Sequence, residues 1–302
     1  MNAPIAIFCY NRLDNLQLTI EHLKKNILAE ESDLYIFSDG GKDDVSWKAV
    51  NKVRTYIHTI SGFKSVSIIE RESNYYLERN IIEGIAYVLQ KYDRIIVLED
   101  DICTSPYFLT YMNEALDYYA TNQRVMHISG FTNLDIQGMG DTYFTPHMGG
   151  WGWATWRDRW QYFRHYSSRE EALQGLTKAD ENRIQYGGAF QILKMLDKNP
   201  IPWDICWNII IYRMGGLCLT PTHTLTRNCG LYQGTHFHSS KLLGYYEYDR
   251  PFSVRHIEVV NPNVESNQHI EKMYETAMID HGMRYNWLGK LLRLVYKKVL
   301  RK

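Results

Sequence analysis

Apolar and polar residues alternate in regular blocks over the N-terminal part of the chain. Short apolar runs at 5–9, 34–37, 66–69 and 95–98 predict buried strands. Between them, apolar residues recur at helical spacing over 13–25, 47–60 and 77–91, which predicts three helices. Strands that alternate with helices in this way predict right-handed crossovers and a parallel sheet. We therefore expect an α/β fold.

Polar clusters follow three of the predicted strands. They are Asn11-Arg12, Ser38-Asp39 and Glu99-Asp100-Asp101. Ligands of parallel sheets bind beyond the carboxyl ends of the strands. The topology therefore predicts that these three clusters meet at one rim of the sheet.

The acidic cluster directly follows the apolar run at 95–98. Three adjacent carboxylates repel one another and resist burial, so a positive group should lie beside them. Oxygen ligands at a strand end suit Mg²⁺ or Mn²⁺ carrying a phosphorylated ligand. As an alternative, Ser105-Pro106 begins a helix whose dipole one acid complements. That alternative accounts for one or two of the acids but not for all three.

Composition narrows the range of functions. The 34 basic residues balance the 34 acidic ones, which argues against a nucleic-acid binder. Five cysteines without a C-x-x-C pair indicate a reducing compartment. We find no signal peptide at the start of the sequence, no apolar stretch long enough to cross a bilayer, and neither a P-loop nor a dinucleotide fingerprint.

The second half of the chain is less regular and carries isolated motifs. They are Gly149 to Trp156 with three tryptophans, Trp203 to Trp207, and Gly234 to His238. The tail from Asn286 to Lys302 has six basic residues, no acid and one apolar helical face. This pattern is typical of an interfacial helix attracted to anionic lipid. A helix docked on the domain with a solvated basic face explains the tail equally well.

Taken together, these motifs resemble those of nucleotide-sugar glycosyltransferases of the GT-A fold. The resemblance is closest to bacterial sugar transferases that are similar to N-acetylglucosaminyltransferase I. It is carried in order by Cys9 to Arg12, Ser38 to Gly40, Glu99 to Asp101 with Ser105 to Phe108, Gly150 to Trp153, Trp203-Asp204, and Gly234 to His236.

The resemblance implies a Rossmann-like, mainly parallel sheet flanked by helices. It implies a glycosyltransferase domain over 1–240, with a nucleotide-binding half over about 1–130 and an acceptor-side half over 131–240. Residues 241–302 would form a C-terminal extension that ends in the basic amphipathic helix.

The resemblance also implies roles for the rim residues. Tyr10, Arg12 and Asp39 would hold the nucleotide, with Asp39 accepting a hydrogen bond from the uracil or the ribose. Asp101 would bind the divalent metal. Glu99 and Asp100 would contact hydroxyl groups of the ribose or donor sugar, and Trp151, Gly152 and Trp153 would form the wall near the transferred sugar and acceptor.

Asp204 is the predicted general base, because the family places its base near a tryptophan-acid pair at this point. Here Ile205 follows the acid where related enzymes carry a second acid, and Ala189-Phe190 stands after Gly187-Gly188 where related bacterial sequences often have acids. A carboxylate partly removed from water has a raised pKa, which suits proton abstraction. As alternatives, Asp204 pairs with Arg213 or caps the following helix.

Two further candidates come from spacing. His236 and His238 lie two residues apart, so in an extended segment both side chains point the same way and can bind metal or phosphate. Arg79, near the start of a helix facing the rim, can meet the diphosphate. Its alternative is a salt bridge with Glu83, four residues on.

The sequence therefore predicts a metal-dependent inverting glycosyltransferase with Mn²⁺ or Mg²⁺ as cofactor. Its donor would be a nucleotide sugar, UDP-linked by preference, and its acceptor a glycan or lipid-linked glycan of bacterial surface polysaccharide synthesis. We expect a cytoplasmic protein that the basic tail can hold at the inner face of the membrane. The alternatives are a sugar-nucleotide nucleotidyltransferase, a non-catalytic nucleotide-sugar-binding protein and a membrane-surface scaffold.

Overall fold

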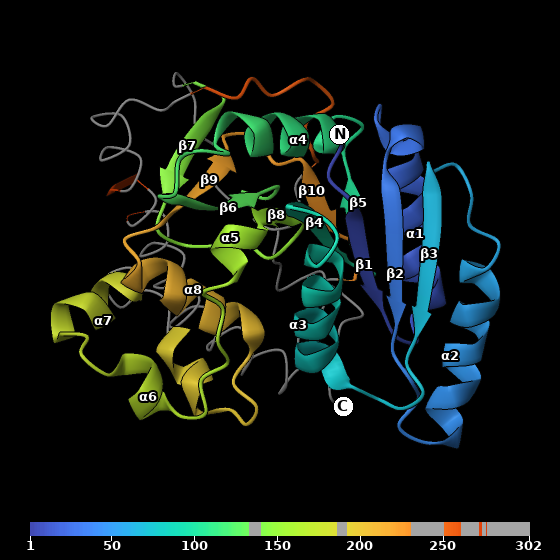
Figure 1. Ribbon diagram of the computed structural model, residues 1–302, viewed down its shortest axis with the longest axis horizontal. Coiled ribbons are helices and arrows are strands. Elements are labelled where there is room, and N and C mark those ends of the chain that lie inside the picture. The colour runs from blue at the N-terminus through green and yellow to red at the C-terminus, as the bar shows by residue number, and fades with distance from the viewer. Residues whose placement is uncertain (133–139, 186–191, 231–250, 261–271, 274–275, 277–302) are drawn as a thin grey trace, which may run out of the picture.

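An eight-stranded mixed sheet forms the centre of the computed structural model (Figure 1), which describes residues 1–132, 140–185, 192–230, 251–260, 272–273 and 276. The strand order is β3-β2-β1-β4-β8-β6-β9-β7, and β5 and β10 form a separate ribbon. The strands are β1 (Ile5–Cys9), β2 (Asp33–Ser38), β3 (Ser65–Glu70), β4 (Arg94–Glu99), β5 (Ile102–Thr104), β6 (Val125–Ser129), β7 (Thr142–Thr145), β8 (Trp153–Trp156), β9 (Leu217–Pro221) and β10 (Thr226–Asn228).

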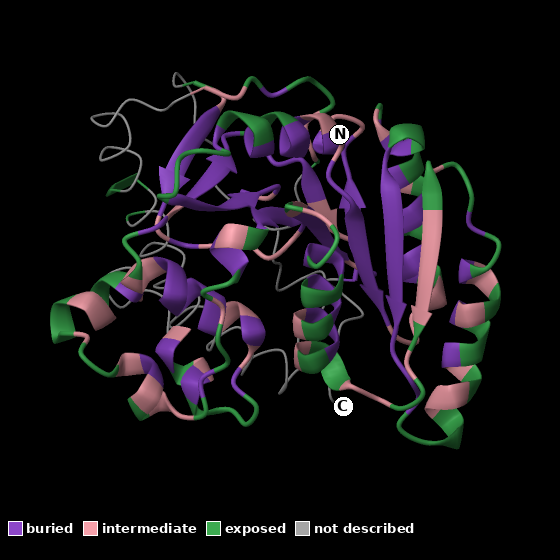
Figure 2. Ribbon diagram, in the orientation of Figure 1, coloured by how far each residue is buried: buried purple, intermediate pink, exposed green. Residues whose placement is uncertain are grey.

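The first four strands form the predicted parallel sheet. β1 pairs in parallel with both β2 and β4, and β2 pairs in parallel with β3. β1 and β2 are buried along their whole length, whereas β3 lies at the edge and is only partly covered (Figure 2). The order β3-β2-β1-β4 reverses direction between β1 and β4, which makes this junction the topological switch point of the sheet.

The helices that connect these strands cover both faces of the sheet. They are α1 (Leu13–Lys24), α2 (Asp44–Ile57) and α3 (Tyr76–Leu89). Leu16 of α1 and Val53 of α2 pack with Ile5 and Ile7 in one core, while Ile85 of α3 packs in a second core on the other face. Strand residues alternate between the two faces, and each face is covered by helices.

Two predicted helix starts differ from the structure. α2 begins earlier than expected because Asp43 and Ser46 form a capping box, in which the Ser46 amide donates to the Asp43 carboxylate at 2.7 Å. The helix after Ser105-Pro106 begins only at Phe108, as α4 (Phe108–Tyr118). Tyr107 rather than Ser105 is its N-cap residue, although the Ser105 hydroxyl accepts from the Tyr107 amide at 3.3 Å and also donates to the carbonyl of Ser253.

The other half of the sheet is mixed. β8 is antiparallel to both of its neighbours, β4 and β6, and β7 is antiparallel to β9, while β6 and β9 are parallel. Four of the described α-helices belong to this half, and three of them, α6 to α8, lie beside it and away from β1–β3 (Figure 1). They are α5 (Arg157–Trp160), α6 (Arg169–Leu173), α7 (Lys178–Ile184) and α8 (Trp203–Arg213), and the short 3₁₀ helices are η1 (Ala29–Glu31) and η2 (Ile192–Asp197).

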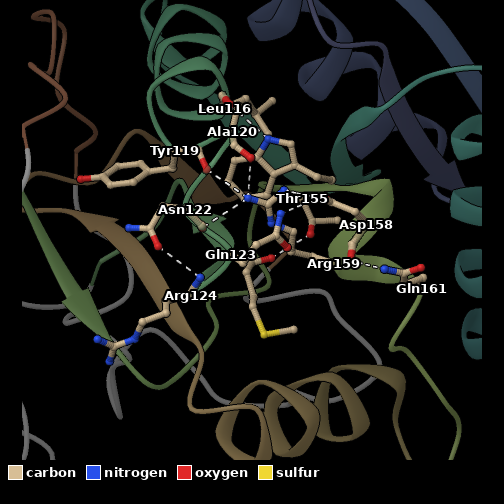
Figure 3. A network of polar contacts seen from close by, with 12 residues as sticks. Leu116, Tyr119, Ala120, Asn122, Gln123, Arg124, Thr155, Asp158, Arg159 and Gln161 are labelled. Carbon is tan, nitrogen blue, oxygen red and sulfur yellow. Dashed lines mark hydrogen bonds and ion pairs between the residues drawn. The ribbon is translucent and has the colours of Figure 1, made fainter.

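Arg159 of α5 forms hydrogen bonds with the turn after α4 (Figure 3). Its side chain is buried, with a relative exposure of 1%, and it donates to the carbonyls of Tyr119 at 3.1 Å, Ala120 at 2.8 Å and Asn122 at 3.2 Å. The guanidinium is neutralised by Asp158, at 2.6 Å. These carbonyls follow the end of α4, so Arg159 supplies donors that the helix end lacks.

Residues 251–260, which we call the C-terminal strap, pack against the predicted 1–240 domain. Arg255 binds both carboxylate oxygens of Asp141, at 2.8 and 2.7 Å, and His256 lies 2.9 Å from Glu114. Ile257 is fully buried in the core that contains α1 and α4. The strap is the first described part of the predicted extension; the tail 286–302 lies outside the described residues. No helix in the described part of the chain has both the length and the apolar character needed to span a bilayer.

Candidate active site

The carboxyl ends of β1, β2 and β4 bring the predicted rim residues to one edge of the sheet. Arg12 lies between β1 and α1, Asp39 directly follows β2, and Glu99 is the last residue of β4. These strands are neighbours and run parallel, so their ends meet, as predicted. The meeting point of β1 and β4 is the switch point, where open α/β sheets bind ligands.

Arg12 holds two of the three acids. Its Nη1 atom donates to Oδ2 of Asp101 at 2.9 Å, and its Nη2 atom donates to Oδ1 of Asp100. The Asp100 and Asp101 side chains are only 4% and 10% exposed, while that of Arg12 is 31% exposed. Burial alone would lower the pKa of Arg12, but the charges of Asp100 and Asp101 outweigh it and raise that pKa.

The third acid faces a different part of the molecule. Side chains of successive strand residues point to opposite faces, so Glu99 follows Val97 towards the core that contains α3 and α8. Burial, and then the charges of Asp101, Asp100 and Asp204, raise the pKa of Glu99 to about 8. The charge of Asp204 contributes least of the three acids to this shift, and Glu99 is not among the main groups that shift the pKa of Asp204.

The acids next to Arg12 are fixed through their backbone. The Thr19 hydroxyl donates to the Asp100 carbonyl at 3.0 Å, and the Cys229 amide donates to the Asp101 carbonyl at 2.8 Å. Gly230 packs against the Asp101 carboxylate so closely that an added Cβ would lie 2.6 Å from Oδ2 and 3.1 Å from Nδ2 of the buried Asn15. Burial raises the pKa of Asp100 to about 6, although Arg12 opposes this shift.

Asp39 is buried and anchors the loop after β3. Its Oδ1 atom accepts hydrogen bonds from the amides of Gly40 at 2.9 Å and Tyr75 at 2.7 Å. Burial raises the pKa of Asp39, and these amides oppose that shift. Gly40 is required here, because an added Cβ would lie 2.4 Å from the carbonyl carbon of Ser73.

The remaining predicted donor-side residues lie at the same rim. The Tyr10 amide is 3.4 Å from Oδ2 of Asp100. Arg79 forms the alternative contact that the sequence allowed, a 2.7 Å ion pair with Glu83, and its guanidinium lies 3.7 Å from the centre of the Tyr75 ring. Arg79 is thus already paired on the surface.

The predicted aromatic wall is divided between surface and core. Trp151 is partly exposed and contacts Phe131, with ring centres 4.5 Å apart. Gly152 has a φ of +73°, and a Cβ there would lie 2.9 Å from the Thr226 side chain. Trp153 is 1% exposed and belongs to the core, and Gly152 is buried as well, so of these three residues Trp151 alone is partly exposed.

Trp153 connects this wall with the predicted base through a stack of three rings. Its ring lies 5.1 Å from that of His127 and 5.3 Å from that of Trp203, each nearly parallel to it. Trp203 begins α8 and is followed by Asp204. The buried stack therefore fixes the start of α8 against the sheet.

Asp204 lies in the first turn of α8, where its Oδ1 atom accepts from the Ile205 amide at 2.9 Å. Burial raises its pKa, with Glu78 of α3 adding to the shift and the helix amides opposing it. Arg213 binds the carbonyls of Ala172 and Gln174, so it is not the partner of Asp204. The helix-start alternative is thus part of the structure, and the charge of Asp204 also adds to the raised pKa of Glu99.

Several candidates lie outside the described residues. They are His236, His238, and the segment Gly187-Gly188-Ala189-Phe190. Gly230 is the last described residue before the histidine motif, which begins at Gly234. Gly230 itself lies against the Asp101 carboxylate.

The acids fit a divalent cation by their chemistry. In the described part of the chain, no three histidine, cysteine or acidic side chains are grouped so as to hold a metal ion by themselves. Mg²⁺ is commonly bound by one or two carboxylates, with substrate phosphates and waters as the other ligands, and carboxylate oxygens suit Mn²⁺ as well. Asp101, whose carboxylate already binds a cationic group, fits such a site together with a phosphorylated ligand.

Comparison with known families decides the class of protein. The sequence model described as glycosyl transferase family 2 matches residues 5–167, which is more than half of the chain. The chain belongs to glycosyl transferase family 2. The match includes Arg12, Asp39, the three acids and Trp151 to Trp153, whereas Asp204 lies beyond it. It identifies a glycosyltransferase of the GT-A fold and does not single out the branch similar to N-acetylglucosaminyltransferase I.

Solved structures of low sequence identity are similar to this glycosyltransferase. One is a mannosyltransferase from Pyrobaculum calidifontis in complex with GDP-mannose and Mn²⁺, with 10% identity over 71% of this chain and 70% of that chain and a TM-score of 0.39. Another is a UDP-glucose pyrophosphorylase complexed with UDP-glucose, with 11% identity over 76% of this chain and 94% of that chain and a TM-score of 0.38. No curated protein sequence matches significantly.

The sequence did not single out several residues of this glycosyltransferase rim. Arg71 follows β3, lies over the Tyr75 ring at 4.7 Å and counteracts the raised pKa of buried Asp39. Lys42 lies 5.8 Å from the centre of the Tyr10 ring. Arg71 could have been found from the sequence, since it lies just beyond a predicted strand of the parallel sheet. Gly230 could not, because its neighbour Asp101 is far away in sequence.

Proposed function

We propose that the chain is a metal-dependent, inverting glycosyltransferase that uses a nucleotide sugar. The observation that carries this proposal is the division of the acids at the switch point. Asp100 and Asp101 face Arg12, while Glu99 faces the side of the sheet from which Asp204 acts on it. This arrangement supports a cation and phosphate site at Asp101, with Asp204 as the carboxylate that would accept a proton.

Asp101 would hold Mn²⁺ or Mg²⁺ together with the donor diphosphate. When bound, the cation stabilises the negative charge that develops on the leaving nucleoside diphosphate. Tyr10, Arg12 and Asp39 would hold the nucleotide, and Glu99 and Asp100 would hydrogen bond to hydroxyl groups of the ribose or sugar. Arg79 is a weaker candidate for a diphosphate contact, because Glu83 already binds it. His236 stays a predicted additional metal ligand.

Asp204 would accept the proton of the acceptor hydroxyl. An alcohol is a poor nucleophile until a positioned base takes its proton, and a base of raised pKa does this more effectively. Burial raises the pKa of Asp204. The acceptor oxygen would then attack the anomeric carbon from the face opposite the leaving diphosphate, beside the partly exposed Trp151.

For the substrates, we propose a UDP-sugar donor and a glycan or lipid-linked glycan acceptor of bacterial surface polysaccharide synthesis. We also propose that the protein acts in the cytoplasm, with residues 286–302 attracted to the inner face of the membrane. The support for the membrane contact is the sequence of the tail, which combines an apolar face with six basic residues and no acid.

Thermal stabilisation by UDP-, GDP- and dTDP-sugars, each with Mn²⁺ or Mg²⁺, tests the proposal. A ligand at a hundred times its dissociation constant stabilises the folded protein by about 2.7 kcal/mol, so the preferred donor should raise Tm clearly. Asp101→Asn should abolish the cation-dependent part of this rise. Asp14→Asn, at an exposed acid in the first turn of α1, is the matched control and should keep it.

The products separate this function from its alternatives. A glycosyltransferase releases the nucleoside diphosphate when an acceptor is supplied. A nucleotidyltransferase would instead form pyrophosphate from a nucleoside triphosphate and a sugar 1-phosphate, and a non-catalytic binding protein would form neither product. If no nucleotide sugar stabilises the protein with either metal, the proposal is wrong.

A further inference from the structure

Arg12 occupies the position of positive charge in the acidic site. Its two terminal nitrogens bind one carboxylate oxygen each of Asp100 and Asp101. Within the described part of the chain, no other basic side chain forms an ion pair with either acid. The guanidinium is therefore the only direct counter-ion that the described residues give to this pair.

Of the three groups, Arg12 is the one that can move. The Asp100 and Asp101 carbonyls accept hydrogen bonds from Thr19 and Cys229, and Gly230 packs directly against the Asp101 carboxylate. The Arg12 side chain, by contrast, is 31% exposed, and within the described part of the chain it forms hydrogen bonds and ion pairs only with the two acids. A long, partly exposed side chain can change rotamer at much lower cost than a buried carboxylate can.

Oδ2 of Asp101 cannot bind Arg12 and a divalent cation equally well at the same time. Oδ2 accepts from Arg12 at 2.9 Å, and a cation bound to this carboxylate would lie close to the guanidinium and repel it. Leaving two buried carboxylates without any positive partner would be costly, so a counter-ion in the absence of a cation stabilises the folded protein.

We propose that Arg12 is the resident counter-ion of Asp100 and Asp101 and competes with the divalent cation for Asp101. Arg12 leaves Asp101 when the cation binds, and its freed guanidinium then faces the rim, where it can bind the donor diphosphate. This inference rests on the proposed function for the cation and for the donor. It predicts that the cation binds before the nucleotide sugar gains its contact with Arg12.

Direct titration with Mn²⁺ alone, followed by the EPR signal of free Mn²⁺, tests the competition without any turnover. Arg12→Met removes the charge and keeps a side chain of similar length. It should bind Mn²⁺ at least about tenfold more tightly than the wild type, a factor equal to about 1.4 kcal/mol. Equal or weaker binding would overturn the inference, because an arginine that merely positions Asp101 would strengthen cation binding.

Lys42→Met is the matched control for charge. Lys42 lies at the same rim and is exposed. Its ammonium group lies over the rings of Tyr10 and Tyr76, and its backbone amide donates a hydrogen bond to the Ser46 hydroxyl. Exposed charges are largely screened by salt, so this variant should change the Mn²⁺ affinity only slightly. An equal gain in both variants would indicate a general effect of charge and would overturn the specific role of Arg12.

Arg12→Lys keeps the test informative if Arg12→Met does not fold. Lysine retains the charge but cannot bind two carboxylates with a planar fork, so its affinity for Mn²⁺ should lie above that of the wild type. Unchanged or weaker Mn²⁺ binding by Arg12→Lys would contradict the competition. Absence of Mn²⁺ binding to every variant, or equal binding to all of them, would overturn this inference. The proposed metal dependence is tested separately, by the cation-dependent rise in Tm with a nucleotide sugar.

Discussion

A buried acid pair in the parallel half of the sheet and a buried histidine in the mixed half differ in charge. At the parallel half, Asp100 and Asp101 lie against Arg12, so charge is kept and compensated. At the mixed half, His127 is fully buried and stacks on Trp153, and burial lowers its pKa to about 3. The buried acids of the first half are thus paired with a cation, whereas this buried histidine of the second half is kept neutral.

Asp204 lies where the two halves meet. Trp203, the residue before it, belongs to the neutral aromatic stack, while Asp204 itself acts on Glu99 of the acidic cluster. The proposed donor and cation contacts therefore lie at the parallel half, and the proposed base is positioned by the aromatic stack of the mixed half. Substitutions in the two halves should therefore differ in their effects on kcat, donor affinity and the free energy of unfolding.

The largest effect is expected from Asp204→Asn. An asparagine keeps the shape but cannot accept the proton, so kcat should fall by about 10³-fold, within the usual range for general bases. Donor affinity should stay close to that of the wild type, because the donor contacts lie at the parallel half. Steady-state kinetics and donor titration measure the two quantities.

Asp44→Asn is the control for this variant, since Asp44 is an exposed acid in the first turn of α2. It should leave kcat unchanged. If Asp204→Asn also transfers sugar at the wild-type rate, Asp204 has only its helix-start role and the base lies elsewhere.

Arg159→Ala should lower the free energy of unfolding by about 3 kcal/mol, because three backbone carbonyls lose a buried donor. Urea denaturation measures the loss. Arg157→Ala removes a guanidinium from the same helix whose ion pair with Asp93 is largely exposed, and it should cost less than about 1 kcal/mol. Equal losses would show that the Arg159 network has no special weight in the mixed half.

The neutrality of His127 predicts a dependence of stability on pH. Its Nε2 atom lies 3.1 Å from the Gly149 carbonyl, and burial lowers its pKa from 6.5 to about 3. Between these values the unfolded chain binds a proton that the folded protein does not, so stability falls as the pH is lowered from 6.5 towards 3. One such proton contributes about 1.4 kcal/mol per pH unit.

His127→Gln should remove this contribution. Its stability, measured by urea denaturation across this pH range, should therefore fall less steeply than that of the wild type. Parallel curves for the two proteins would mean that His127 is protonated in the folded state, and the contrast between the halves would lose its basis.

Arg79→Ala should have the smallest effect. Arg79 is exposed and pairs with Glu83 within α3, so its removal should leave the free energy of unfolding nearly unchanged. The donor KM should also change little, and Glu83→Gln is the matched partner variant. A large rise in KM for Arg79→Ala alone would show that Arg79 leaves Glu83 to bind the diphosphate.

The parallel half could be predicted from the sequence because its signals are local. Four apolar runs specify β1 to β4, and the rim follows from their order, since parallel neighbours end at the same edge. The early start of α2 was missed, although Asp43 and Ser46 carry a capping signal.

Contacts between distant residues could not be predicted in this way. Cys229 and Gly230 lie against Asp101, and Trp153 is buried between His127 and Trp203. Nothing in the local pattern of Gly150 to Trp153 distinguishes a partly exposed tryptophan from a buried one two residues later. The mixed half depends on such pairings, and for this reason its sequence predicted motifs but no topology.

The C-terminal strap has a practical consequence for work with shorter forms of the protein. A fragment trimmed at residue 240 would strip Ile257 from the core and leave Asp141 without the two hydrogen bonds from Arg255. The apolar surface exposed beside α4 would then favour aggregation. Expression trials that seek a minimal catalytic unit should therefore retain residues up to 260.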